Sequence, residues 1–439
     1  MKFGIKRSNK TPMNKITHSC ENITPFGGLN FVYNAMNRMG LHEFLDKVIG
    51  SRSLMAKYTF GDIIYSLFGN TLTQGSFVAD VQILKAKFSN QTFDRIPSPD
   101  TIEYASQELK KESRIVTTTK GVIHEINENA HLNKALIALA VKTKQLRPDK
   151  EHTLDYDNVV IEHEKQDAKY SYKSSKGYHP GIAFIDRIPV HIENRNGNTP
   201  ASYGQEEVLQ KCFENLASFN IKVKNFRADC ASYQKAVIEL AVKHTDNFFI
   251  RMLDFEGIRE LCGQIKEWQT VEVNCEKKEV TSILYKPFKE DKEYRVVVIR
   301  KQKKDQQMDL LSGTAYSYQG IITNNVAMTE KEVIEFYNQR GDAENSNRYL
   351  LNDFNLHHLP FMDLDTNTIY MYFMAMCATL FEWIKEVLVK NKTKTIDVKM
   401  GTKAVCFHYI TVATKFVKHA REKILRVYSS SQNYCILKI

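Results

Sequence analysis

The segment from Tyr337 to Arg348 places charged and aromatic side chains at helical spacing, and it constrains this chain more than any other stretch. At roughly 100° per residue, Tyr337, Arg340, Glu344 and Arg348 fall within about 80° of one another on one helix face. A face that packs against a core is apolar, and this face is not. A carboxylate between arginines suits a metal-bound phosphate site. For this segment alone, a solvated face with ion pairs between successive turns stays open.

Two strand-like runs upstream carry aspartates near their carboxyl ends. The first holds Asp155 and Asp157 on one face, because side chains alternate along a strand. The second ends in Asp229, directly before a helical stretch. A strand-end aspartate is a common cap or turn residue. Carboxylates at the carboxyl ends of strands also lie where open α/β sheets bind ligands. Together with Glu344, these acids predict a site for a pair of magnesium ions.

The order of the predicted elements is that of a ribonuclease H-like core. A strand bearing Asp157 precedes two strands joined by a short turn, a helix, the Asp229 strand, another helix and a further strand. A distant helix begins at Thr329, forms a capping box with Glu332 and continues past Glu344. The predicted fold class is α/β, with a β-rich insertion before this last helix.

Five strings of residues carry a resemblance to a known family. They are 154–158 (Leu-Asp-Tyr-Asp-Asn), 176–180 (Lys-Gly-Tyr-His-Pro), 193–197 (Glu-Asn-Arg-Asn-Gly), 226–233 (Phe-Arg-Ala-Asp-Cys-Ala-Ser-Tyr) and 337–354. Together they resemble the DDE transposases of bacterial insertion sequences. More narrowly, the chain resembles the insertion sequence 1380 family, which belongs to the group 1 DDE transposases.

The resemblance implies a catalytic triad of Asp, Asp and Glu. The second acid carries over to Asp229 and the third to Glu344. The first is ambiguous, because the family has an Asp-x-Asp pair at that place. Asp157 is preferred, since it stands where related enzymes have Asp followed by a small residue and Thr, and Asp155 is the alternative. Asn158 follows Asp157 here, which keeps both open.

The last helix of related transposases carries a Tyr-x2-Arg-x3-Glu-x6-Lys signature. Tyr337, Arg340 and Glu344 match it, and the tyrosine and arginine are expected to hold the DNA strand. Leu351 stands where the family has lysine. Arg348, about one turn earlier, is expected to take over that contact with DNA.

The resemblance also implies a mechanism, a cofactor and partners. Two Mg²⁺ ions would be held by Asp157, Asp229 and Glu344, with Mn²⁺ as a substitute because the ligands are hard carboxylates. An activated water would cut the end of the element, and the freed 3′ hydroxyl would attack target DNA. The expected partners are double-stranded DNA, as terminal inverted repeats and target, and a second copy of the chain.

A helical N-terminal DNA-binding domain is a further implication of the family. Ser98 is the expected cap of a helix whose end, at Lys110 and Lys111, makes it a candidate recognition helix. A plain packing helix is the alternative. The tail is basic and is predicted to contain a helix from Ala413 to Val427. The predicted domains are a helical domain (1–150), the ribonuclease H-like core (151–252 and 326–388), the β-rich insertion (253–325) and the basic helical tail (389–439).

Composition narrows the class of protein. The 439 residues carry a net charge of +10, with a pI near 8.9, which favours a polyanionic partner. The eight cysteines form no Cys-x-x-Cys pair, so a structural zinc site is not expected. Their scattered positions are typical of a protein in a reducing cytoplasm. Residues 369–381 are the most apolar stretch and are too short to cross a bilayer. A cytoplasmic, nucleoid-associated protein is expected, and His179 is interpreted as a buried or capping residue.

Two other functions stay open from the sequence. A stand-alone metal-dependent nuclease of the same fold would use the same carboxylates without recognising terminal repeats. A DNA-binding protein derived from a transposase would have lost catalysis, and the missing lysine at position 351 favours that alternative.

Overall fold

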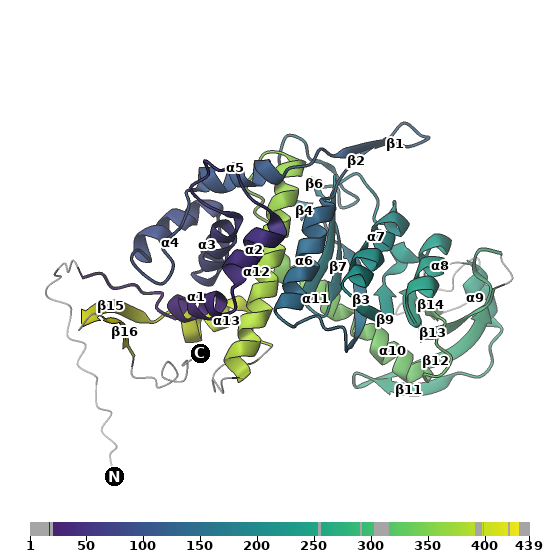
Figure 1. Ribbon diagram of the computed structural model, residues 1–439. Coiled ribbons are helices and arrows are strands. Elements are labelled where there is room, and N and C mark those ends of the chain that lie inside the picture. The colour runs from purple at the N-terminus through teal and green to yellow at the C-terminus, as the bar shows by residue number, and fades with distance from the viewer. Residues whose placement is uncertain are drawn as a thin grey trace, which may run out of the picture.

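The computed structural model describes residue 17 and residues 21–252, 256–289, 292–302, 316–390, 397, 399–419 and 422–429. Across this part of the chain runs a mixed sheet of eleven strands, with helices packed against it and a helical region beside one end (Figure 1). The predicted α/β class is confirmed at this level.

Five strands form the middle of the sheet. They are β3 (Glu151–Asn158), β7 (Gly181–Ile185), β8 (Ile188–Arg195), β9 (Lys222–Ala228) and β10 (Asn247–Arg251), in the order β8-β7-β3-β9-β10. Strands β3, β9 and β10 are parallel, whereas β7 and β8 are antiparallel to their neighbours. Because β3 and β9 are parallel neighbours, with Tyr156 opposite Ala228, their carboxyl ends meet at one edge of the sheet.

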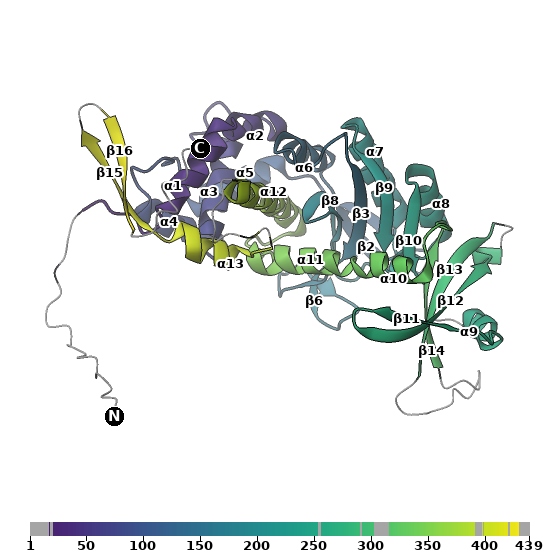
Figure 2. The same ribbon diagram turned by 90° about the horizontal axis from the view of Figure 1, so that it is seen from below.

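Helices cover both faces of these strands. Figure 2 shows α7 (Gln205–Ser218) and α8 (Lys235–His244) on one face, with α10 (Glu330–Asn338) and α11 (Gly341–Asp353) on the other. The predicted amphipathic helix after β8 is present as α7, and its apolar residues Val208, Phe213 and Leu216 are buried.

The predicted continuous helix from Thr329 past Glu344 is wrong. The capping box of Thr329 and Glu332 is present, but α10 ends at Asn338 and α11 begins at Gly341. Gln339 and Arg340, between the two helices, keep right-handed helical backbone angles, so the interruption is a short turn. The second helix, α11, begins three residues before Glu344.

The β-rich segment continues the same sheet. Strands β11 (Gln269–Val273), β12 (Glu276–Tyr285), β13 (Tyr294–Gln302) and β14 (Tyr316–Thr323) follow a short helix, α9 (Glu256–Gly263). They extend the sheet beyond β10 in the order β14-β13-β12-β11, with antiparallel pairing throughout. Helix α10 packs on them through Val333 and Ile334, which are fully buried.

The N-terminal region is mostly helical in the described residues. Its helices are α1 (Gly28–Arg38), α2 (Leu41–Ile49), α3 (Phe60–Leu72), α4 (Val81–Lys87), α5 (Pro99–Leu109) and α6 (Ala130–Lys142). They share one hydrophobic core with α12 (Leu364–Lys390), which is buried over nearly its whole length. None of the helices in the described ranges combines the length and apolarity needed to cross a membrane.

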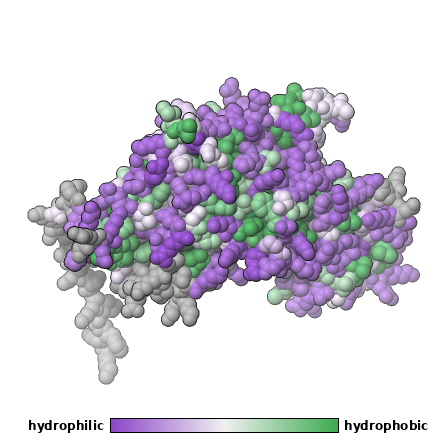
Figure 3. Space-filling model, viewed as in Figure 1, coloured by the Kyte–Doolittle hydropathy of each residue, from purple (hydrophilic) through white to green (hydrophobic). Residues whose placement is uncertain are grey.

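Two strands interrupt this helical region. Strands β1 (Arg114–Thr117) and β2 (Ile123–Asn127) form a hairpin that pairs with β8 and adds to the large sheet. Figure 3 shows a mostly hydrophilic face with an apolar group over this hairpin, where Ile115, Val122 and Ile123 are exposed.

The predicted helix from Ala413 to Val427 is also wrong. After a short helical stretch that includes α13 (Thr402–Val405), the tail forms a hairpin of β15 (Ala413–His419) and β16 (Glu422–Tyr428). Its β-branched and aromatic residues favour strands. A bridge between Thr24 and Thr414 ties the hairpin to the start of the described chain.

Candidate active site at the end of strand β3

The two aspartates of β3 have different partners. The Asp155 carboxylate accepts hydrogen bonds from Nε and Nη2 of Arg227, both at 2.7 Å. The two residues lie opposite each other on β3 and β9, and both are buried. A two-point contact of this kind occupies both carboxylate oxygens. Asp155 is therefore held inside the sheet.

Asp157 lies at the open end of the same strand. Its Oδ1 accepts a hydrogen bond from Arg340 Nη2 at 2.9 Å, and its Oδ2 accepts one from Asn347 Nδ2 at 3.1 Å. The side chain is half-buried, at 14% exposure. Burial raises the pKa of Asp157 to about 6, against the opposing charge of Arg340, and the negative charges of Asp229 and Glu344 add to the rise.

Glu344 reaches the same place from the first turn of α11. Its Oε1 lies 3.1 Å from Nη1 of Arg340, so this one guanidinium joins Asp157 and Glu344. The Arg340 side chain is 7% exposed, whereas that of Glu344 is 61% exposed. Glu344 can therefore change its conformation at little cost, and Arg340 cannot.

Asp229 stands at the end of β9, in the first position of a short turn. Its Oδ1 accepts the backbone N–H of Ala231 at 3.0 Å, and the side chain is half-buried. The hydroxyl of Tyr337 donates to the carbonyl of Ala228 at 3.3 Å, which fixes α10 against this end of β9. Asp229 directly follows Ala228, which is paired with Tyr156 on the neighbouring parallel strand, so Asp157 and Asp229 lie at the same edge of the sheet.

The other residues predicted from the sequence lie on α11 and at the end of α5. Arg348 is exposed, one turn beyond Glu344 on α11. Lys110 and Lys111 follow the end of α5, and the Lys110 ammonium pairs with Asp363 at 3.1 Å. Helix α5 packs into the N-terminal core through Ile102 and Ala105, which leaves both interpretations of this helix open.

Two residues at this site were missed from the sequence. Asn347 contacts Asp157. The one feature of the sequence that could have indicated this contact is its position one helical turn after Glu344. Arg227 pairs with Asp155, and its signal was a cation two residues before Asp229 in an otherwise apolar strand end. The side-chain oxygen of Asn347 is buried and has no hydrogen-bond partner among the described residues.

The oxygen donors suit a hard divalent cation such as Mg²⁺ or Mn²⁺. Within the described residues, no three Asp, Glu, His or Cys side chains are gathered closely enough to hold a metal ion. The guanidinium of Arg340 lies where two of the carboxylates converge. A cation could join Asp157, Asp229 and Glu344 only after Glu344 leaves Arg340, and the exposure of Glu344 permits this.

The two aspartates should respond differently to loss of charge. Asp155→Asn should lower the free energy of unfolding by about 3–5 kcal/mol, because it leaves the buried Arg227 without its counter-charge. The raised pKa of Asp157 means that this group stabilises the fold below about pH 4 and loses that contribution as the pH rises through about 6. Burial raises the pKa of Asp155 as well, so the difference between the variants comes from the arginines. Asp157→Asn should cost much less at pH 7.5, because Arg340 keeps Glu344 as a counter-charge. Denaturant unfolding of both variants measures this, and equal losses would contradict it.

Binding of a divalent cation should compete with a proton on Asp157. Because the pKa of this carboxyl is about 6, apparent affinity for Mn²⁺ should fall by about tenfold between pH 7 and pH 5. Electron paramagnetic resonance of free Mn²⁺ gives the affinity at each pH. Asp157→Asn is the control and should bind weakly at both values. An affinity that does not change with pH would count against Asp157 as a ligand.

Comparison with known proteins adds the family. The family model described as "Transposase DDE domain group 1" matches residues 8–436. No curated protein matches the chain. The cryo-EM structure of a piggyBac transposase synaptic complex with hairpin DNA is similar, with a TM-score of 0.42 and 11% identity, covering 88% of this chain and 80% of that chain. The family match spans nearly the whole sequence, and the chain therefore belongs to the group 1 DDE-domain transposase family.

Proposed function

We propose that this protein is a transposase that binds the ends of an insertion sequence and catalyses cleavage and strand transfer through Asp157, Asp229 and Glu344. The observation that carries the proposal is the convergence of Asp157, Arg340 and Glu344 at the carboxyl end of β3, with Asp229 at the end of the neighbouring parallel strand. Asp155 is set aside as the first acid, because both of its oxygens are bonded to Arg227.

The arrangement around these acids supports the finer parts of the proposal. Antiparallel β7 and β8 beside parallel β3, β9 and β10 match the strand order expected of a ribonuclease H-like core. The proposed divisions are the N-terminal region (1–150), the core (151–252 and 326–388), the insertion (253–325) and the tail (389–439). Membership of the insertion sequence 1380 family is proposed on the five sequence strings.

Asp157, Asp229 and Glu344 would hold two Mg²⁺ ions, or Mn²⁺ as a substitute. Bound there, the ions would activate a water or hydroxyl nucleophile and stabilise the leaving oxygen. Arg340 keeps the acids paired until then. Once Glu344 is released, one side of the Arg340 guanidinium is free to bind a phosphate oxygen of the DNA.

The proposed DNA contacts are chosen by the solvent exposure of the side chains near the acids. Arg348 is exposed beside Glu344 and is the proposed phosphate contact in place of the missing lysine. Leu351 is half-buried against the hydrophobic core that α12 forms with the N-terminal helices, so a cation at this position would be poorly placed. The Tyr337 hydroxyl is bonded to β9, which leaves its ring as the part that can meet DNA. Lys110 and Lys111 are proposed contacts of the N-terminal region with the terminal repeat.

The assembly and location are proposed on the chemistry of the reaction. Two element ends must be joined to one target, so two copies of the chain are expected in the DNA complex. A protein that acts on chromosomal DNA in a bacterium works at the nucleoid.

The second candidate is a DNA-binding protein that has lost catalysis. One observation favours it: the Arg340 guanidinium already pairs with Asp157 and Glu344, so these two carboxylates have a cationic partner without a metal. The joining experiment below separates the two candidates.

Arg348→Ala should weaken binding to duplex DNA without changing its sequence preference. Loss of one phosphate contact should reduce the slope of log affinity against log salt by about one. Leu351→Lys is the matched variant. It should not strengthen binding, and it should lower thermal stability because it places a charge at the edge of the core. Anisotropy titrations over a range of salt concentrations measure both. An unchanged salt slope for Arg348→Ala would show that Arg348 does not contact the DNA phosphates.

The function itself is tested by Mg²⁺-dependent joining of a labelled DNA end, taken from the sequence that flanks the gene, into a plasmid. Wild type should join the end, whereas Asp229→Asn and Glu344→Gln should lose at least a hundredfold in rate, because removing a metal ligand removes the activated nucleophile. Cleavage without joining would indicate the stand-alone nuclease. Binding with neither reaction would indicate the non-catalytic DNA binder.

A further inference from the structure

A small antiparallel sheet projects from the end of β3, next to Asp157. It consists of β4 (Ile161–Glu162), β5 (Lys169–Tyr170) and β6 (Lys176–Tyr178), in the order β4-β6-β5. The amide of Val159 donates to the carbonyl of Pro180 at 3.1 Å, so both ends of this excursion leave from the paired ends of β3 and β7. In Figure 2 β6 lies on the opposite side of α11 from α6 and α7.

The root of this small sheet is fixed by Asn196 and Gly197, which follow β8. The side-chain oxygen of Asn196 accepts the amide of Lys169 at 2.8 Å, and its side-chain nitrogen donates to the carbonyl of Asp167 at 2.8 Å. The amide of Gly197 donates to the carbonyl of Gly177 at 2.9 Å. A Cβ at position 197 would lie 2.4 Å from the Lys169 carbonyl oxygen, so only glycine allows this approach.

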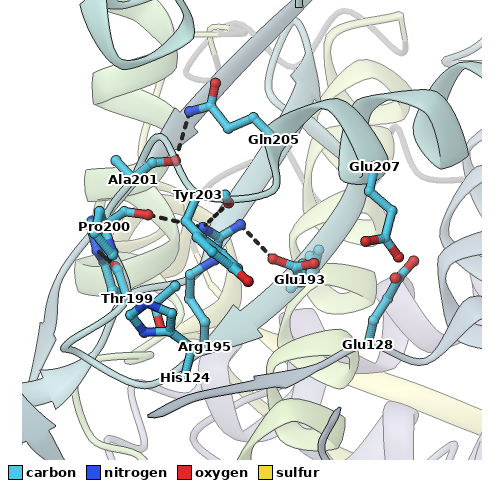
Figure 4. Close-up of polar contacts among 12 residues, drawn as sticks. His124, Glu128, Glu193, Arg195, Thr199, Pro200, Ala201, Tyr203, Gln205 and Glu207 are labelled. Carbon is cyan, nitrogen blue, oxygen red and sulfur yellow. Dashed lines mark hydrogen bonds and ion pairs between the residues drawn. The ribbon is translucent and has the colours of Figure 1, made fainter. Parts of the chain in front are cut away.

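The loop that follows is fixed in turn by a buried arginine. Figure 4 shows the Arg195 side chain extending to the loop carbonyls on one side and to Glu193 on the other. Its Nη1 donates to the carbonyl of Tyr203 at 2.9 Å and to that of Pro200 at 3.2 Å, and its Nη2 donates to the Glu193 carboxylate. Arg195 and Glu193 are both buried. The small sheet therefore stands on a rigid base.

The tip of the small sheet carries exposed aromatic rings beside cations. Tyr170 is 65% exposed and Tyr172 is 75% exposed. The Lys176 ammonium lies 5.6 Å from the centre of the Tyr170 ring, and that of Lys173 lies 5.9 Å from the Tyr172 ring. The segment 168–176 contains three lysines, and the Lys176 ammonium also lies 3.9 Å from the exposed Glu164 carboxylate. Rings and cations side by side on a rigid support suit a strand of nucleic acid, whose bases stack and whose phosphates are negative.

The tip is also close to the catalytic acids. The Tyr172 ring lies 5.5 Å from the imidazole of His179, which is buried and bonded through Nδ1 to the carbonyl of Thr199 at 2.9 Å. Burial lowers the pKa of His179, the charge of Lys173 lowers it further, and the charge of Asp229 raises it. His179 lies two residues before β7, in which Ile182 is paired with Asp157, so the tip is close to this end of β3.

We propose that Tyr170 and Tyr172 stack on unpaired bases of the DNA strand beside the cleaved phosphate, while Lys173 and Lys176 contact the phosphates of the same strand. This inference deepens the proposed transposase function and depends on it. The ligand is single-stranded because both faces of a base inside a duplex are covered by its neighbours, and a tyrosine ring can stack only on a face that is free.

The test compares three DNA probes in the absence of divalent cation. They are a duplex element end with a four-nucleotide unpaired flank, the same DNA with an abasic flank, and the blunt duplex. The double variant Tyr170→Ala/Tyr172→Ala should bind the unpaired flank about tenfold or more weakly than wild type. Its affinity for the abasic and blunt probes should be unchanged. Anisotropy titrations give all the affinities.

Two matched variants separate stacking from other causes. Tyr170→Phe/Tyr172→Phe should bind like wild type, because stacking needs the ring and not the hydroxyl. Tyr428→Ala removes a tyrosine that is 45% exposed on β16, and it should have no effect on any probe. Thermal melts of each variant check that the fold is intact.

Equal loss on all three probes, or no loss on any, would overturn the inference. If wild type joins DNA and the tyrosine variants bind every probe normally, the inference fails and the proposed function stands. If wild type binds none of the probes and joins no DNA, both fail.

Discussion

The pairing of Arg227 with Asp155 is the interaction on which the geometry of the acids depends. Two nitrogens of the guanidinium bind Asp155 on β3, and Nη1 donates to the carbonyl of Phe336 at the end of α10. The same guanidinium lies 4.9 Å from the centre of the Phe336 ring. One side chain on β9 therefore connects β3 and α10 to its own strand. These three elements lead to the three candidate acids, so their relative positions are set by a group that takes no part in the proposed chemistry.

Arg340 solves a different physical problem. Burial disfavours the charge of Asp157 and raises its pKa, and the nearby charges of Asp229 and Glu344 raise it further. The guanidinium between Asp157 and Glu344 supplies positive charge at that point. The cation is permanent, because arginine does not lose its proton in proteins, whereas a bound metal is exchangeable. The site can therefore stay assembled without metal and still open through the exposed Glu344.

Local patterns predicted much of the core and only part of the site. Periodicity and capping depend on residues that are close in sequence. They predict the strands around Asp157 and Asp229, the α7 helix and the capping box at Thr329. The break between α10 and α11 does not follow from them, and Arg340 at this break contacts Asp157, a residue far away in the sequence.

The same limit explains the other differences. Asp155 and Asp157 are alike in sequence, and only the register between β3 and β9 places Arg227 opposite the first of them. The tail is predicted to contain a helix, but its residues form two strands that are held by pairing with each other and by a bridge to Thr24. In both cases the deciding partner lies on another element of the fold.

The burial of α12 has a consequence for how such a protein can change over evolutionary time. This helix is surrounded by the N-terminal helices and by residues of β7 and β8, such as Phe184 and Ile192, in a single hydrophobic core. Residues 1–150 therefore do not form a module with an interior of its own. An exchange of that region between relatives would leave the apolar surface of α12 facing foreign side chains. Change in this region is therefore accommodated more readily by point substitution at exposed positions than by exchange of the whole region.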